Sequence, residues 1–135
     1  MANRNFSEYG LSLEKRVVHL FAHVTFGASG APTLDTANSK GIASISRTSA
    51  GLFVITLADV YYKLLNVAGT FTVAAGSFPA APVIQHCTNT VSTDGKITVQ
   101  FSGPTNATTT TLLATDPANG EKIHMTITLG DSSAF

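Results

Sequence analysis

The stretch GIASISRTSAGLFVITL, residues 41–57, constrains the fold more than any other part of the chain. Two runs rich in β-branched residues flank RTSAG, a turn-forming segment that ends at Gly51. Alternation with a period of two is typical of strands, and it places Phe53, Ile55 and Leu57 on one face. The stretch therefore predicts an antiparallel hairpin with a connection of about five residues, in which Gly51 supplies a positive φ if one is needed.

The opposite face of the second run is also apolar, since Leu52 and Val54 lie there. A strand of a small isolated domain usually shows one face to water, so we expect another surface to cover these side chains. Only 12% of the residues are charged, against roughly 25% in ordinary soluble domains. Two readings stay open: burial in an assembly of subunits, or a Ser/Thr-rich surface that is polar without charge. A covering helix or second sheet in the same subunit would also exclude water from this face.

The same alternation recurs in other segments and indicates further strands. A strand from Val17 has Val17, Phe21 and two histidines on its second face. Residues 27–40 read as a loop, and residues 59–67 as a short helix or an edge loop. The inward residues that the patterns predict are Val18, Leu20, Ala22, Val24, Phe26, Phe71, Val73, Ile97, Val99, Phe101, Ile123, Met125, Ile127 and Leu129.

Seven or eight short strands separated by turns predict an all-β fold, a single antiparallel β-sandwich or jelly-roll-like barrel. We expect an N-terminal arm at residues 1–16 and one domain at residues 17–135. The eight basic and eight acidic residues balance, which argues against nucleic acid or an anionic membrane as a partner. The start of the chain has no apolar segment typical of a signal peptide, and no apolar run approaches the roughly 20 residues of a membrane span.

The residues that could carry chemistry do not form a recognisable motif. His19 and His23 lie four residues apart, a spacing that could hold zinc on a helix, but the alternation here predicts a strand, on which they share one face about two pleats apart. Adjacent His86 and Cys87 point to opposite faces, and we expect Cys87 to be a small buried side chain. His124 could approach Cys87 from another strand, which sequence cannot decide. We therefore expect no catalytic residues, no metal and no cofactor.

Two stretches resemble known proteins. SKGIASISRTSAGLFVITL, with its Gly-aliphatic-x-Ser-aliphatic-x-Arg-x-x-x-Gly-aromatic pattern, resembles the hairpin of small virion proteins of tailed bacteriophages. DPANGEKIHMTITLGDSSAF is similar to the C-terminal ending of those proteins, in which an Asp-Pro-x-x-Gly turn precedes a last alternating strand. That ending usually has an Arg-Asn pair before its serines, where this chain has Gly130 and Asp131. VTFGASGAPTLDTANSKGI, a strand and an Ala/Gly/Pro loop, is also similar.

The resemblance implies a non-enzymatic phage structural protein, made in the host cytoplasm and located on the capsid surface. It implies a decoration (cement) protein that stabilises the head as a homotrimer and contacts the major capsid protein. The alternative is a tail-associated or receptor-binding domain that contacts host glycans. Under the trimer hypothesis, we expect the subunit interface to include Leu52, Val54, Val17 and Phe21.

Overall fold

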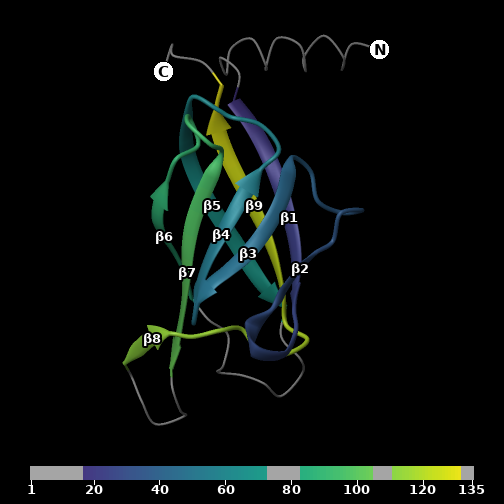
Figure 1. Ribbon diagram of the computed structural model, residues 1–135, viewed down its shortest axis with the longest axis vertical. Coiled ribbons are helices and arrows are strands. Elements are labelled where there is room, and N and C mark those ends of the chain that lie inside the picture. Colours follow the sequence, from purple (N-terminus) through teal and green to yellow (C-terminus); the bar gives the residue numbers. More distant parts are fainter. Residues whose placement is uncertain (1–16, 73–82, 105–110, 132–135) are drawn as a thin grey trace, which may run out of the picture.

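The computed structural model describes residues 17–72, 83–104 and 111–131, and these form nine strands in two packed antiparallel sheets (Figure 1). The predicted arm at residues 1–16 lies outside the described residues. The strands are β1 (Val17–Phe26), β2 (Pro32–Leu34), β3 (Ile42–Ser49), β4 (Leu52–Leu57), β5 (Lys63–Thr72), β6 (Val83–Asn89), β7 (Lys96–Pro104), β8 (Leu112–Ala114) and β9 (Lys122–Gly130).

The two sheets make a sandwich, which confirms the predicted fold class. Sheet A has the order β2-β1-β9-β5. Sheet B has the order β3-β4-β7-β6, with β8 paired to β7. Strands β2 and β8 have three residues each, too few to show an alternating pattern, so the sequence analysis predicted fewer strands. A 3₁₀ turn, η1 (Ala28–Gly30), is the helical element among the described residues, and no helix there is long and apolar enough to cross a membrane.

The core lies between the inner faces of the two sheets. Phe26 of β1, Phe53 of β4 and Phe101 of β7 are fully buried, with ring centroids 4.9–5.7 Å apart. Edge-to-face and tilted contacts of this kind add to the roughly 1.5–3 kcal/mol that burial of each large apolar side chain contributes. The predicted inward residues of β1, β4, β7 and β9 lie in this core, except that Val18 is partly buried and packs against it. Val73 is not among the described residues.

The hairpin of residues 41–57 is present, but its turn is tighter than predicted. Ser49 pairs directly with Leu52, so Ala50 and Gly51 alone connect β3 to β4. The prediction of a five-residue connection is wrong because a β-bulge between Arg47 and Ser49 extends β3 beyond the regular alternation. Gly51 has a φ of 71°, in the left-handed region that glycine adopts at low cost.

The prediction of a short helix or edge loop at residues 59–67 is wrong in its second half. Strand β5 begins at Lys63 and pairs with β9 along ten residues. The register shifts between Leu64 and Asn66, so one residue there interrupts the period of two. The first part of β5 therefore does not show the regular alternation from which a strand is predicted.

Candidate functional site

The four residues predicted for the subunit interface lie on two opposite faces of the sandwich. Val17 and Phe21 belong to β1 and point away from the core on the outer face of sheet A. Leu52 and Val54 belong to β4 and point away from it on the outer face of sheet B. Phe21 is 43% exposed and the other three are partly buried. The structure thus places the members of each pair on one face but separates the two pairs by the thickness of two sheets.

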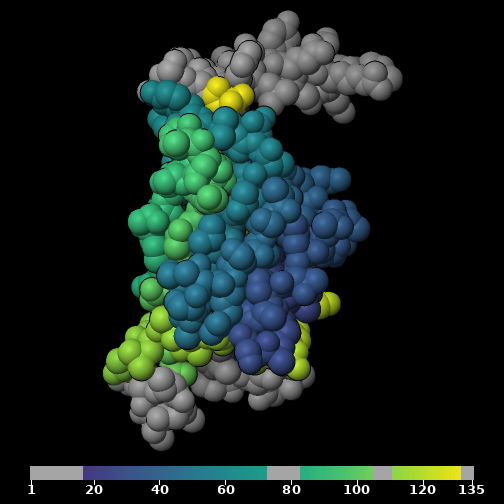
Figure 2. Space-filling view, in the orientation of Figure 1, coloured from purple at the N-terminus to yellow at the C-terminus, as the bar shows by residue number. Residues whose placement is uncertain are grey.

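The outer face of sheet B has mainly uncharged polar residues around its apolar centre, with Lys96 opposite Thr56 as a charged neighbour, and Figure 2 shows this side of the molecule. Val54 lies between Ser46 of β3 and Thr98 of β7 in the strand register. Leu52 lies between Ser49 and Gln100 in the same way. This face therefore fits both explanations of the low charge content. Its hydroxyl and amide side chains form a polar surface without charge, and its two half-buried apolar side chains could be covered in an assembly.

The outer face of sheet A carries a pair of histidines that the sequence analysis did not join. His19 and His23 share this face as predicted, but the close neighbour of His23 is His124 on β9. The two residues pair across the strands, and their ring centroids lie 4.2 Å apart. His19 instead has its Nδ1 atom 3.2 Å from the Thr128 hydroxyl. Because β1 and β9 are separated by almost a hundred residues, no local spacing could reveal the pair.

This histidine pair lines a pocket of about 350 Å³. Lys122 and Thr72 contribute from β9 and β5, and Thr25 from β1. Asp35 and Asn38 contribute from the loop after β2. The pocket is thus lined mainly by polar side chains, among them a cation, an anion and two imidazoles. We refer to it below as the histidine pocket.

Asp35 fixes the loop that forms one wall of the histidine pocket. Its Oδ2 atom accepts a hydrogen bond of 2.7 Å from Asn38 Nδ2, and its Oδ1 atom accepts from the backbone N–H groups of Ala37 and Asn38. The side-chain bond from Asn38 is the main cause of a lowered pKa at Asp35, to which these N–H groups and the nearby His23 also contribute. Asp35 is therefore a fixed negative charge beside the histidine pair.

The backbone of His23 holds the same loop in place. Its N–H group donates to the Ser39 hydroxyl at 3.0 Å, and its carbonyl accepts from the Asp35 N–H group at 2.8 Å. Ser39 itself is buried. The wall of the pocket is therefore a built part of the fold and is tied to the strand that carries His23.

Cys87 is exposed, so its prediction as a buried side chain is wrong. It lies on β6, where the register against β7 shifts between His86 and Thr88. This β-bulge places an extra residue on an edge strand, where the simple inside-outside alternation does not hold. His124 lies on sheet A and Cys87 on sheet B, so the structure gives no pairing of the two as nucleophile and base. Among the described ranges, no group of three His, Cys, Asp or Glu side chains converges to hold a metal ion.

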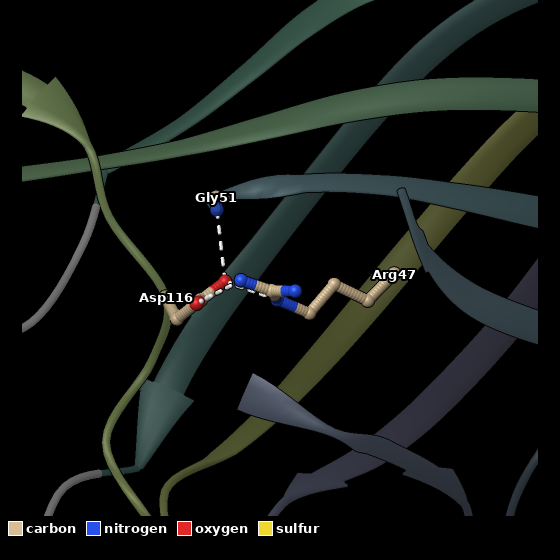
Figure 3. A network of polar contacts seen from close by, with 3 residues as sticks. All are labelled: Arg47, Gly51 and Asp116. Atoms are coloured by element: carbon tan, nitrogen blue, oxygen red, sulfur yellow. Dashed lines mark hydrogen bonds and ion pairs between the residues drawn. The ribbon is translucent and has the colours of Figure 1, made fainter. Parts of the chain in front are cut away.

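A second polar network joins the hairpin to the segment before β9 (Figure 3). Arg47 donates two hydrogen bonds to the Asp116 carboxylate, from Nε at 2.9 Å and from Nη2 at 2.7 Å. The Gly51 N–H group donates to Asp116 Oδ1 at 2.8 Å. The pKa of Asp116 is lowered, mainly by the hydrogen bonds from Arg47 and further by the Gly51 N–H group.

This network connects the stretches on which the resemblance to phage virion proteins rests. Arg47 and Gly51 belong to the hairpin pattern, and Asp116 opens the Asp-Pro-x-x-Gly turn of the ending. Gly30, in the Ala/Gly/Pro loop, approaches so closely that an added Cβ atom would lie 2.6 Å from Asp116 Cγ. One structural junction therefore explains why glycine, arginine and aspartate occupy these positions. The junction holds parts of the fold together and needs no ligand.

Tyr61 and Tyr62 are the adjacent aromatic residues that a glycan-contacting domain could use for stacking against sugars. They face different environments, since Tyr61 is partly buried and packs against the core, whereas Tyr62 is 52% exposed.

Comparison of the chain with models of known protein families, with curated proteins and with solved structures finds no match. The geometry of the two outer faces and of the histidine pocket therefore carries the functional argument.

Proposed function

We propose that this protein is a non-enzymatic structural component of a tailed-phage virion, a decoration protein that binds the outside of the head as a homotrimer. The observation that carries the proposal is the placement of two apolar pairs, partly buried except for the exposed Phe21, on opposite outer faces. A decoration trimer needs one surface for its sister subunits and another for the shell. The pair Leu52 and Val54 and the pair Val17 and Phe21 supply two such surfaces.

The two pairs take different roles because of symmetry. In a closed ring of three, both interface surfaces of a subunit must turn toward the threefold axis. Opposite faces of a sandwich point in opposite directions, so both pairs together would favour an open stack instead of a ring. We assign Leu52 and Val54 to contacts between subunits, and Phe21 with Val17 to the major capsid protein. This division revises the expectation that all four residues form one interface.

Further support comes from the composition and from the motifs. The register partners of Val54, Ser46 and Thr98, are uncharged, so burying Val54 against another subunit desolvates no charge at these two positions. The three stretches that resemble phage virion proteins meet at Asp116, as expected if they form one structural unit. Three linked weak contacts on a shell then gain strength from effective concentration.

The assignment of Phe21 is tested with phage heads that lack the protein, purified from the phage that encodes it. Phe21→Asp should remain a folded trimer, because Phe21 is 43% exposed and lies outside the core. We expect it to lose sedimentation with the heads, since an unpaired charge would be buried against the capsid protein. His19→Asp is the matched control, two residues away on the same outer face.

Three results would count against this account. If the wild-type protein does not sediment with the heads, the decoration function is wrong. If Phe21→Asp binds as well as the wild type, the shell contact lies elsewhere. If His19→Asp abolishes binding equally, a charge anywhere on this face is disruptive and Phe21 has no special role.

A further inference from the structure

The histidine pocket lies on the same outer face of sheet A as Phe21, and in the free protein it is open to small solutes. Its volume of about 350 Å³ exceeds that of a few water molecules and suits a small solute. His23 and His124 lie directly opposite each other, with ring centroids 4.2 Å apart. Lys122, two residues from His124 on β9, pairs with both Thr25 and Thr72 in the strand register. An ammonium group and two hydroxyl groups therefore belong to the row of residues next to the histidine pair.

The charges around the histidine pair nearly cancel when both imidazoles are neutral. Lys122 on β9 contributes a positive charge, and Asp35 in the loop after β2 contributes a negative one. Strand β5 presents Thr70 opposite His124 and Thr72 opposite Lys122, and neither is charged. Lys40, which pairs with Phe21 beside β1, and His19 add basic groups farther along this face.

Protonation of the two histidines makes the net charge of the pocket more positive. Protonation of both imidazoles would add two positive charges to the pocket. Two imidazolium rings about 4 Å apart repel each other unless an anion lies between them or beside them. Asp35 supplies one negative charge near His23, which leaves the second imidazolium charge and that of Lys122 without an anionic partner in the pocket lining.

We propose that the histidine pocket binds a small oxyanion, a phosphate- or carboxylate-bearing molecule, and that binding is coupled to protonation of His23 and His124. Each protonated ring donates from both nitrogens, and such charge-assisted hydrogen bonds to an oxyanion are about twice as strong as neutral ones. The Lys122 ammonium and the Thr25 and Thr72 hydroxyls are further donors on the same wall. The bound anion removes the repulsion between the rings, so binding and proton uptake favour each other.

The coupling is measured by calorimetric titration of the full chain with inorganic sulfate, an oxyanion whose charge does not change over the pH range used, with chelator present and ionic strength held constant by chloride. The affinity should increase about tenfold or more between pH 7.5 and pH 5.5, the size of a typical coupling between two binding events. Heats measured in buffers of different ionisation enthalpy should show net proton uptake on binding. Phosphate and acetate, compared at pH 5.5, distinguish the ligand class: binding of both indicates oxyanions in general, and binding of phosphate alone indicates phosphate groups.

Matched variants separate the pocket from the rest of the molecule. His23→Gln and His124→Gln should each remove most of the pH dependence and the proton uptake. His19→Gln and His86→Gln should keep both, since these histidines lie outside the pocket. Backbone amide signals in NMR spectra, followed during the titration, report whether each variant is folded and whether the shifts map to β1, β9 and the loop after β2.

Several outcomes would overturn the proposal. Sulfate binding that is independent of pH, or equal in the His23→Gln/His124→Gln double variant, would show that the histidines do not bind the anion. Amide shifts that cluster away from the pocket would have the same meaning. If zinc without chelator stabilises the protein through these two histidines and phosphate does not bind, the pocket is a metal site instead.

Discussion

Asp116 is the residue at which three distant parts of the chain meet. Its carboxylate accepts two hydrogen bonds from Arg47 and one from the Gly51 N–H group, and Gly30 leaves no room for a side chain beside it. The Arg47 and Asp116 side chains are 33% and 21% exposed, so water screens the pair only in part. The bidentate geometry fixes the orientation of both groups, which an isolated surface ion pair does not.

The charge of Asp116 should make the free energy of unfolding depend on pH. Because the pKa of Asp116 is lowered in the folded protein, its contribution is complete above the ordinary value of about 3.9 and is lost as the pH falls through the lowered pKa. Asp116→Asn should cost about 1 kcal/mol at pH 7, less than a buried charged hydrogen bond because of partial exposure. Urea unfolding between pH 7 and about pH 2 measures the difference, which should shrink at the acidic end.

The control for Asp116 is the exposed ion pair of Lys96 with Asp94, whose side chains are 49% and 44% exposed. Lys96→Gln should leave the unfolding midpoint unchanged, since solvated pairs contribute little. If Asp116→Asn lowers the free energy of unfolding by the same amount at every pH, Asp116 stabilises the fold through the shape of its side chain and not through its charge.

At the scale of an element, the β3–β4 hairpin depends on a close approach between backbones. An added Cβ atom at Gly51 would lie 2.5 Å from the Thr115 nitrogen and 2.6 Å from the Phe101 carbonyl oxygen. Gly51 also accepts at its carbonyl from the Phe101 N–H group at 2.7 Å, which ties the turn to β7. The turn is thus fixed by its neighbours and not only by its own residues.

Gly51→Ala should therefore be much more destabilising than the positive φ alone explains. Alanine at a positive φ costs about 1–2 kcal/mol, and displacement of the backbone of β7 or of the segment at Thr115 should raise the total to roughly 3 kcal/mol or more. Gly120→Ala is the matched control, because Gly120 has a φ of 89° with no atom within 4 Å of its added Cβ. Chemical unfolding of both variants gives the comparison; equal losses would show that the contacts at Gly51 can relax.

The strands could be predicted where alternation is regular, and were missed where bulges interrupt it. The inward faces of β1, β4, β7 and β9 follow from period two, because both sheets bury one face. Bulges near Arg47, Leu64 and Cys87 shift the register by one residue, and there the turn length, the start of β5 and the burial of Cys87 were predicted wrongly. The histidine pocket could not be predicted, because it depends on which strands become neighbours.

At the scale of the whole molecule, two substitutions in adjacent positions separate folding from assembly. Ile55 is fully buried in the core, whereas Val54 is partly buried on the outer face of sheet B. Ile55→Asp should unfold the subunit, because an unpaired charge in the core costs several kcal/mol. Val54→Asp should leave the circular dichroism spectrum of the fold intact but dissociate the trimer, since the same charge is then buried at each subunit contact. A folded trimer in Val54→Asp would show that this face is solvated.

The mass of the purified wild-type protein in solution tests the central claim most directly, because decoration by a ring of three requires that ring to be stable. Light scattering across micromolar concentrations should report about three times the 14.0 kDa of one chain. A monomer of 14.0 kDa throughout that range would contradict the trimer and, with it, the assignment of Leu52 and Val54 to a subunit interface.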